Sequence, residues 1–234
     1  GGVGKTTSVL NIAAGPLRYS DITSSVLTID MDPHGCASSA LLGKIDGTPS
    51  SRTIFDVLRR AITPQDGITS TVFQENIDVL PASPHLESMA KTQIYDRLKK
   101  VTEALASAYG WILIDTPPNM GVLTMNALAA ADSLLLPLQC EYFALEGLSA
   151  LMNTIQHIAD SVNPSLQVEG ILRTMYDPRN SLTNDVSSQL HTHFGDRVYR
   201  TVVPRNVRLA EAPSHGLPAM YYDKYSRGSK AYMA

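Results

Sequence analysis

The sequence has few cysteines and no long apolar run. Only two cysteines, Cys36 and Cys140, occur among 234 residues, which argues against a disulfide scaffold and for a reducing compartment. No apolar stretch approaches the ~18 residues that a bilayer requires, and the chain shows no signal peptide. We therefore expect a cytoplasmic protein without a membrane partner, and we interpret both cysteines as core thiols.

Charge of neither sign dominates, because the formal net charge is only −3. Its distribution is uneven, however. From Arg197 to Ala234, seven Lys/Arg stand against two acidic residues, a net +5, and the remaining twelve Lys/Arg and twenty Asp/Glu leave −8 for residues 1–196. A basic end on an acidic body is expected where one face meets a polyanion, although a solvated basic tail has the same pattern.

Short aliphatic runs alternate with segments of helical period. The predicted strands are Val26–Ile29, Ile77–Leu80, Trp111–Ile114, Ser133–Leu138, Gly170–Arg173 and Val198–Val203. Two predicted helices bury one face each, formed by Leu148, Leu151, Ile155, Ile158 and Val162, and by Leu98, Val101, Leu105 and Ala108. This alternation predicts an α/β fold in a single domain over residues 1–234, with a doubly wound, mostly parallel sheet and helices on both faces.

The chain begins inside a phosphate-binding loop, Gly1-Gly2-Val3-Gly4-Lys5-Thr6-Thr7. Glycines allow successive N–H groups to point at phosphate oxygens, the lysine adds a charge for the β/γ-phosphates, and the threonine hydroxyl suits Mg²⁺. Only the second half of the P-loop pattern is present, so we expect the preceding strand to be missing. Because Gly15-Pro16 interrupts the helical pattern, the first helix should end near Ala14.

Carboxylates follow two of the predicted strands, where ligands of such sheets lie. Asp30 and Asp32 come after the first strand, and one of them could orient a water near a γ-phosphate. Alternatively, they cap the next helix or form an Asx-turn. Asp115 ends an apolar strand, which is the Walker B arrangement for Mg²⁺, with a helix cap as the alternative.

A third polar segment, 204–208, follows the last strand. Its proline-stiffened loop could line an adenine ring, and an ordinary surface turn fits the residues equally well. His191 and His193 lie two apart in a predicted helix, so they do not share a face and are interpreted as solvated side chains rather than metal ligands.

Taken together, these segments resemble the deviant Walker ATPases of the ParA/Soj chromosome- and plasmid-partition family, a branch of the MinD/ParA superfamily. The resemblance covers essentially the whole chain. It rests on GGVGKTT (1–7), TIDMDPHG (28–35), ILIDTPPNMGVLTMNALAAAD (112–132), LPLQCEYFALEGL (136–148), TMYDPRNSLTNDV (174–186) and VVPRNVRLAEAPSHG (202–216). The last two segments are typical of the ParA/Soj branch.

The resemblance implies an ATPase that uses ATP and Mg²⁺ and is weak without its partner. The residues implied to bind the phosphates are Gly1, Gly2, Val3, Gly4, Lys5, Thr6 and Thr7. Catalysis would fall to Lys5, to Asp32, which positions the attacking water, and to Asp115. The metal would be held by Thr6 and Asp115, and the adenine by Pro204, Arg205 and Asn206.

The resemblance also implies how the chain works in DNA segregation. An ATP-dependent homodimer would bind double-stranded DNA of the nucleoid without sequence preference through Arg179 and Arg208. A ParB-like centromere-binding protein would stimulate ATP hydrolysis and release the dimer. The expected location is the bacterial cytoplasm, in association with the nucleoid.

The chain departs from the family pattern in several places. The family's signature lysine would directly precede Gly1. Where the family usually has D-P-Q-G-N, this chain has Asp32-Pro33-His34-Gly35-Cys36. The third departure is Gly15-Pro16, which interrupts the first helix where the family's helix runs on into a Gly-Lys turn. The final segment, 222–234, fits the family and is expected to stop inside its last helix.

Three other functions are compatible with part of the sequence. A MinD-like membrane-cycling ATPase for division-site placement has the same nucleotide chemistry but needs a C-terminal amphipathic helix. A reductase like the nitrogenase iron protein needs two cysteines beside a shared cluster, and neither Cys36 nor Cys140 lies where that cluster would be. A nucleotide-dependent scaffold without catalysis is the third.

Overall fold

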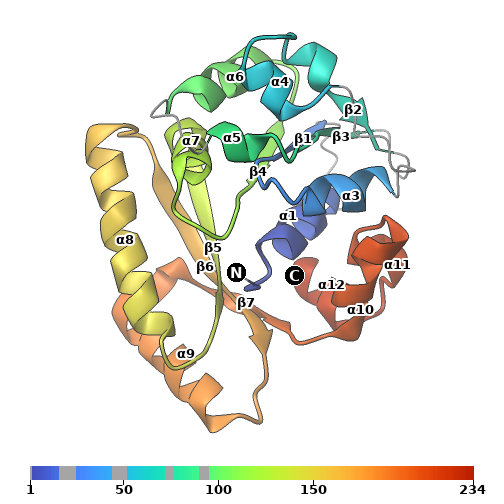
Figure 1. Cartoon of the computed structure of the whole chain (residues 1–234). Coiled ribbons are helices and arrows are strands. Elements are labelled where there is room, and N and C mark those ends of the chain that lie inside the picture. Colours follow the sequence, from blue (N-terminus) through green and yellow to red (C-terminus); the bar gives the residue numbers. More distant parts are fainter. Residues whose placement is uncertain (1, 16–24, 44–51, 72–75, 90–94) are drawn as a thin grey trace.

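Two sheets form the frame of the computed structural model, which describes residues 2–15, 25–43, 52–71, 76–89 and 95–234 (Figure 1). The first sheet has the order β2-β3-β1-β4 and the second the order β5-β6-β7. The strands are β1 (Val26–Asp30), β2 (Thr69–Ser70), β3 (Ile77–Leu80), β4 (Trp111–Asp115), β5 (Ser133–Gln139), β6 (Gln167–Tyr176) and β7 (Val198–Pro204). All six predicted strands are confirmed.

Strand pairing is parallel throughout except at one edge, where the two-residue strand β2 runs antiparallel to β3. In the first sheet, β1 lies between β3 and β4, and Asp30 is directly opposite Asp115. Both aspartates therefore lie at the carboxyl edge of the sheet, as the sequence predicts.

Helices cover both faces of each sheet. They are α1 (Lys5–Ala14), α3 (Cys36–Leu42), α4 (Ile54–Leu58), α5 (Leu86–Met89), α6 (Arg97–Leu105), α7 (Val122–Ala130), α8 (Ala144–Ser161), α9 (Ser181–Phe194), α10 (Val207–Glu211), α11 (Ala219–Tyr222) and α12 (Arg227–Tyr232), with short 3₁₀ turns η1 (Gln65–Gly67), η2 (Gly195–Arg197) and η3 (Ala212–His215).

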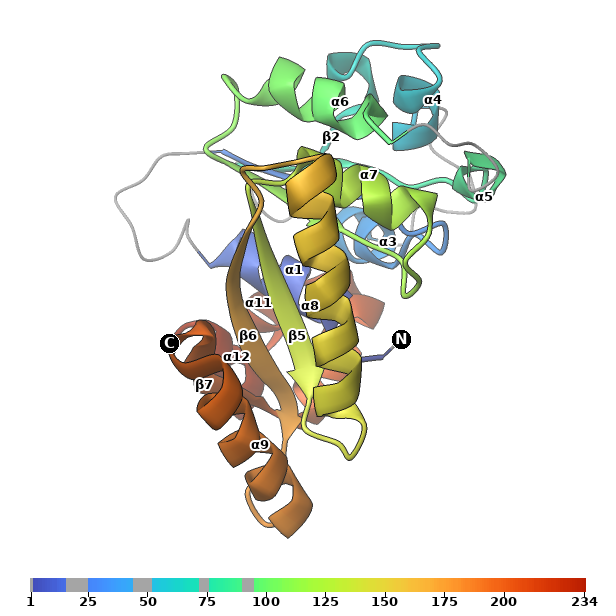
Figure 2. The ribbon, with the colours of Figure 1, turned by 90° about the vertical axis from the view of Figure 1, so that its left-hand side faces the viewer.

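Side-chain alternation along the strands explains this layering. In the first sheet, Val79 packs with Leu10 of α1 and Leu41 of α3, whereas its neighbour Leu80 packs in the cluster formed with α4 to α7. In the second sheet, α8 and α9 cover one face (Figure 2), and Ile171 packs with residues of both helices. The next residue, Leu172, packs with α10 and α11. The doubly wound, mostly parallel α/β fold is therefore confirmed.

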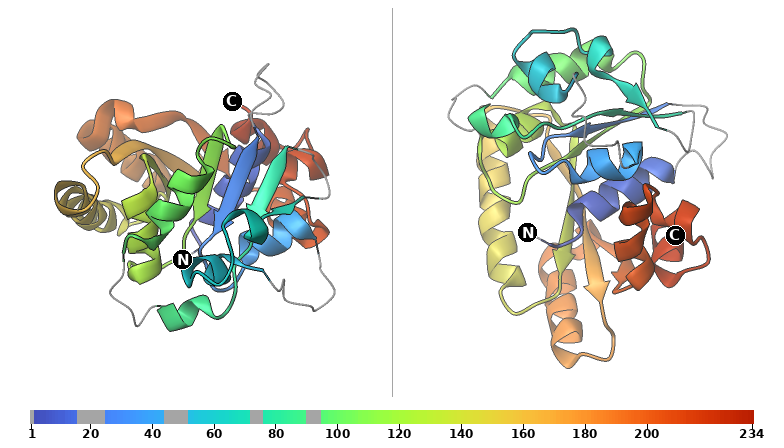
Figure 3. Two further views of the ribbon diagram at one scale, coloured as in Figure 1. Left: turned by 90° about the horizontal axis from the view of Figure 1, so that it is seen from above. Right: turned by 45° about the vertical axis from the view of Figure 1, so that its right-hand side comes forward.

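Helix α1 links the two sheets, since it packs against β4 of the first and β5 of the second. The C-terminal helices hold its other side (Figure 3). Asn11 accepts a hydrogen bond from the Ala219 N–H at 3.0 Å, and the Ser8 hydroxyl lies 2.9 Å from that of Tyr232. The C-terminal helices therefore pack directly against α1.

The helix predictions hold with two corrections. Helix α1 ends at Ala14 as expected, and Pro16 lies outside the described residues. Ala108 and Val162, however, are exposed and lie beyond the ends of α6 and α8, so they are not part of the buried faces. None of the described helices combines the length and apolar character needed to cross a bilayer.

Candidate functional site

The phosphate loop leads directly into α1. Gly2 and Gly4 adopt φ values of 84° and 86°, a left-handed conformation that only glycine takes without strain. The Thr174 hydroxyl, at the end of β6, donates a 2.8 Å hydrogen bond to the Val3 carbonyl. The Ser8 N–H closes the first helical turn on the Gly4 carbonyl at 2.9 Å. Gly1 lies outside the described residues.

Thr6 and Asp115 form the centre of the candidate site. The Thr6 hydroxyl donates to Oδ2 of Asp115 at 2.7 Å. Asp115 is completely buried, and burial raises the pKa of its carboxyl to about 7, with the charges of Asp30 and Asp32 adding to the effect and Thr6 and Lys5 opposing it. An ionised carboxylate here therefore needs a nearby cation.

Asp30 is completely buried, and hydrogen bonds from neighbouring residues hold both of its carboxylate oxygens. Its Oδ2 accepts hydrogen bonds from the N–H of Ser38 at 2.8 Å and from the Ser38 hydroxyl at 2.7 Å, and its Oδ1 accepts one from the Asp32 N–H at 3.1 Å. The Ser38 hydroxyl in turn accepts from the Ala82 N–H at 2.8 Å. Desolvation by burial raises the pKa of Asp30. Asp30 therefore connects β1 to α3 directly and, through Ser38, to the loop after β3.

Asp32 is the more accessible of the two carboxylates, with 13% of its side chain exposed. Its Oδ1 accepts the backbone N–H of His34 at 3.0 Å, which is the Asx-turn considered from the sequence. The same oxygen lies 2.8 Å from Nδ1 of His34. Oδ2 accepts no hydrogen bond among the described residues, so it is free to meet a ligand or water.

The loop predicted beside adenine follows β7. Pro204 pairs with Tyr176 of β6, two residues beyond the Thr174 that anchors the phosphate loop, so this loop leaves the carboxyl edge of the adjacent strand. Arg205 is exposed and Asn206 half-buried. Oδ1 of Asn206 is buried and has no partner among the described residues, which suits a hydrogen-bond donor from a ligand.

The two predicted DNA-binding arginines are exposed, but each is paired with a carboxylate. Arg179 donates to Asp177 through Nε at 2.9 Å and Nη2 at 2.8 Å. Those hydrogen bonds hold the pKa of Asp177 well below its usual range. Arg208 donates to Glu211 at 2.8 Å and lies 3.5 Å from Asp223. Neither arginine has a hydrogen bond or ion pair with the described residues of the phosphate loop, 2–7.

Ser38 and Thr174 shape the site and were not predicted. Thr174 could have been found by the reasoning that identified Asp115, because it also lies near the carboxyl end of a parallel strand. Ser38 sits within α3, and no pattern in the sequence marks its contact with Asp30.

The structure confirms the predictions for the two histidines and for Cys140 and contradicts the prediction for Cys36. His191 and His193 are exposed as predicted, and the described residues hold no cluster of three or more metal-ligating side chains. Cys140 is a buried thiol, but the prediction for Cys36 is wrong. It is exposed because it occupies the first position of α3.

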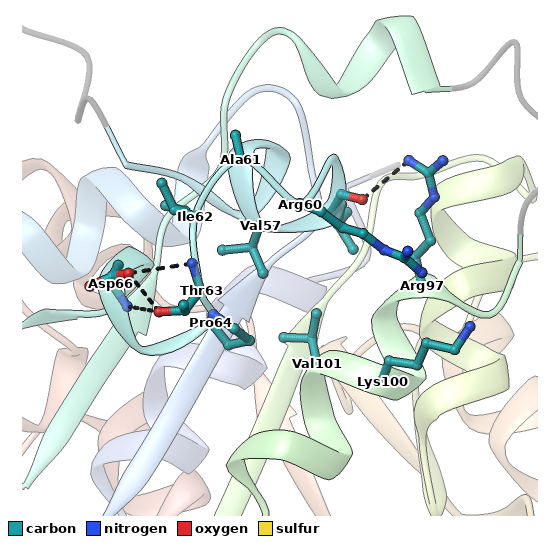
Figure 4. A pocket seen from close by; sticks show the side chains of 11 residues that line it. Val57, Arg60, Ala61, Ile62, Thr63, Pro64, Asp66, Arg97, Lys100 and Val101 are labelled. Atoms are coloured by element: carbon teal, nitrogen blue, oxygen red, sulfur yellow. Dashed lines mark hydrogen bonds between the residues drawn. The ribbon is translucent and has the colours of Figure 1, made fainter.

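A cavity of about 470 Å³ lies away from this site, between α4, α6 and the segment that follows α4 (Figure 4). Val57, Leu58 and Val101 give it an apolar floor, and Arg60 and Arg97 stand at its rim. Helices α4 and α6 cover the face of the first sheet opposite α1. The cavity is therefore separate from the phosphate loop.

Comparison with known proteins identifies close relatives of the chain. A family model described as an AAA domain matches residues 1–168. The sporulation initiation inhibitor protein Soj of Bacillus subtilis (strain 168) is 44% identical over 238 residues, which cover 100% of this chain and 92% of Soj. The chromosome partitioning protein ParA of Caulobacter vibrioides (strain NA1000 / CB15N) is 42% identical over 241 residues, covering 100% of this chain and 88% of that ParA.

A solved structure shows the same fold. Cobyrinic acid a,c-diamide synthase from Mycobacterium smegmatis, with bound ADP and magnesium, is similar with a TM-score of 0.80 at 30% identity. The match covers 100% of this chain and 87% of that one. The two relatives named above, Soj and ParA, are each matched over all of this chain and over 88% or more of their own length. The chain therefore belongs to the ParA/Soj family of ATPases.

Proposed function

We propose that this chain is an ATP-dependent chromosome or plasmid partition protein, which binds ATP and Mg²⁺ and hydrolyses ATP to ADP and phosphate. The observation that supports this best is the 2.7 Å bond between the Thr6 hydroxyl and the buried Asp115 carboxylate. Hydroxyl and carboxylate oxygens are ligands that Mg²⁺ prefers, and a cation offsets the cost of ionising a buried carboxyl. A structure of this fold with bound ADP and magnesium agrees with this assignment.

In this proposal, residues 1–7 bind the phosphates. Left-handed glycines and the first turn of α1 present backbone N–H groups to an anion, and the positive end of the helix dipole adds to the attraction. Lys5 supplies a charge at the β/γ-phosphates and assists hydrolysis, while Thr6 and Asp115 hold the metal. When bound, Mg²⁺ neutralises charge that develops on the phosphates.

Asp32 is proposed to orient the attacking water. Its Oδ2 is free among the described residues, and its carboxylate follows the strand next to the one that ends in Asp115. A carboxylate in this position accepts a proton of the water and holds the oxygen toward the γ-phosphate.

Pro204, Arg205 and Asn206 are proposed to line the adenine. The unpartnered Oδ1 of Asn206 supports this role, since the exocyclic amine of adenine donates hydrogen bonds. The proline stiffens the loop and presents an apolar edge to the ring. We propose that residues 1–234 act together as one nucleotide-binding domain.

The proposed biological role uses an ATP-dependent homodimer. Dimerisation would align Arg179 and Arg208 of both subunits along one duplex and give binding to phosphates without base readout. The net charge of +5 on residues 197–234 supports placing this part of each subunit against the DNA phosphates. A ParB-like protein would stimulate hydrolysis, and loss of the γ-phosphate contacts would release the dimer from nucleoid DNA in the bacterial cytoplasm.

One experiment separates this proposal from its alternatives. ATP hydrolysis is measured with and without a ParB-like partner and duplex DNA, and the ATP-bound protein is sedimented with DNA or with anionic liposomes. ATP-dependent sedimentation with DNA is the expected result. Sedimentation with liposomes alone would indicate a MinD-like membrane-cycling ATPase, and binding of ATP without turnover under any condition would indicate a scaffold.

A further inference from the structure

One oxygen of Asp32 is held twice by the same residue. Oδ1 accepts the backbone N–H of His34 at 3.0 Å and lies 2.8 Å from Nδ1 of its ring. A carboxylate oxygen only accepts hydrogen bonds, so the short ring contact requires a hydrogen on Nδ1. The backbone bond alone restrains the χ2 torsion of the carboxylate from one direction. The ring bond adds a second direction and fixes the plane of the group.

We propose that His34 is a positioning residue for ATP hydrolysis, whose ring holds the Asp32 carboxylate so that Oδ2 faces the attacking water. This inference rests on the proposed role of Asp32. His34 itself has 75% of its side chain exposed and needs no contact with the nucleotide to act in this way. Its effect should therefore fall on the rate of hydrolysis rather than on the affinity for ATP.

The strength of this restraint depends on the protonation of the ring. The hydrogen bond to Asp32 raises the pKa of His34, and the charges of Asp32 on its own loop and of Glu87 on α5 raise it further. Asp32 and Glu87 are the charged groups among the described residues that raise the pKa of the ring. In the imidazolium form, Nδ1 always carries a hydrogen and the bond is charge-assisted. The neutral ring donates more weakly, and in one tautomer it presents a lone pair to the carboxylate.

The direction of the pH effect follows. Below the pKa of His34 the ring is charged and the carboxylate is held in place. As pH rises through that pKa, the restraint weakens, and kcat should fall. A glutamine at position 34 can also donate to Asp32, but it does not titrate.

The experiment compares His34→Ala and His34→Gln with the unchanged chain, by measuring kcat and KM for ATP from pH 5.5 to 9, a range that brackets the ordinary histidine pKa of about 6.5. His34→Ala should lower kcat about three- to tenfold at low pH and leave KM unchanged, the loss expected for one ordinary hydrogen bond at an exposed position. His34→Gln should restore kcat and remove the decline at high pH. His193→Ala, a change of an exposed histidine on α9, is the matched control and should behave as the unchanged chain does.

Two results would overturn the inference. One is a kcat of His34→Ala equal to that of the unchanged chain at every pH. The other is the same pH profile for the unchanged chain and for His34→Gln. Asp32→Ala is assayed in parallel: if it hydrolyses ATP at the full rate, the role of Asp32 and this inference fail together. If Asp32→Ala is inactive while His34→Ala is fully active, only the inference about His34 fails.

Discussion

The Thr6 hydroxyl and the Asp115 carboxylate meet at 2.7 Å although 109 positions separate them in the sequence. The bond joins the start of α1 to the end of β4, and it gives the buried carboxylate a polar partner. The same two oxygens are the proposed metal ligands. Binding of Mg²⁺ would therefore exchange an internal hydrogen bond for coordination, with little rearrangement of either element.

Replacing Thr6 tests this exchange directly. Thr6→Ala should weaken Mg²⁺-dependent ATP binding at least about tenfold and cost about 1–2 kcal/mol of stability, since Asp115 loses its buried donor. Thr6→Ser keeps the hydroxyl and should retain both properties. Binding is measured by titration with a fluorescent ATP analogue at several Mg²⁺ concentrations. Equal Mg²⁺ dependence in the alanine variant would contradict the assignment, and Thr154→Ala on the exposed side of α8 is the control.

Removing the Asp32 carboxylate should slow ATP hydrolysis without weakening ATP binding. Asp32→Ala should bind ATP with normal affinity and lose about 10²-fold or more in kcat, the usual contribution of a positioned acid–base group. Single-turnover hydrolysis and nucleotide titration measure the two quantities. Asp185→Ala, at an exposed position of α9, controls for the change of charge. Turnover at the normal rate would refute the proposed role of Asp32.

Charge reversal at Arg208 tests the DNA-binding surface. Arg208→Glu should abolish salt-sensitive DNA binding and leave ATP binding intact, because the change adds repulsion at the phosphate backbone. Arg59→Glu is a close control: Arg59 is similarly exposed and also lies beside a carboxylate, Asp56, but it directly follows α4. DNA affinity is measured at several salt concentrations. Unchanged affinity in Arg208→Glu would argue against the proposed surface.

Removing the carboxylate partners of Arg179 and Arg208 should strengthen DNA binding, the opposite of the effect expected for Arg208→Glu. Glu211→Gln and Asp177→Asn each remove a negative charge next to a proposed DNA contact. Both variants should bind duplex DNA more tightly, by about two- to fivefold at low salt, and the difference should shrink as salt screens the charges. Weaker binding than that of the unchanged chain would show that the ion pairs serve to orient the arginines for DNA.

Asp30 should make stability depend on pH in a defined direction. Burial raises its folded pKa above the unfolded value, so the folded state binds more protons and loses stability as pH rises through the interval between the two values. Asp30→Asn cannot ionise. Urea unfolding at pH 5 and pH 8 should therefore show the stability advantage of the unchanged chain over Asp30→Asn shrinking as pH rises. A constant or growing advantage would contradict this.

The parts of the fold that follow from local pattern could be predicted. Strands such as 111–115 are continuous apolar runs that end in a polar residue, so both their existence and the position of Asp115 at the sheet edge were predictable. Strand β2 was missed because two residues carry no periodicity. Ala108 and Val162 continue the helical spacing past the points where the helices end, and spacing alone does not contain those end points.

The side chains that surround and hold the site residues are brought there by tertiary contacts, which local sequence pattern does not reveal. Ser38 meets Asp30 only because α3 packs back across the end of β1. The burial of the Asn206 oxygen without a partner among the described residues likewise arises only in the folded chain. The pairing of Arg179 and Arg208 with carboxylates was likewise not evident. A sequence identifies cations, but the rotamers that bring them to neighbouring anions are set by the folded surface.

The contacts that hold the phosphate loop have a consequence for synthesis of the chain on the ribosome. Val3 is anchored by Thr174, and α1 is held by Ala219 and Tyr232, so the partners lie 171, 208 and 224 positions downstream. The loop leaves the ribosome before any of these supports is made. We therefore expect a nascent chain to remain unable to bind nucleotide until Tyr232 has been translated, which delays the first catalytic cycle until α12 has packed against α1.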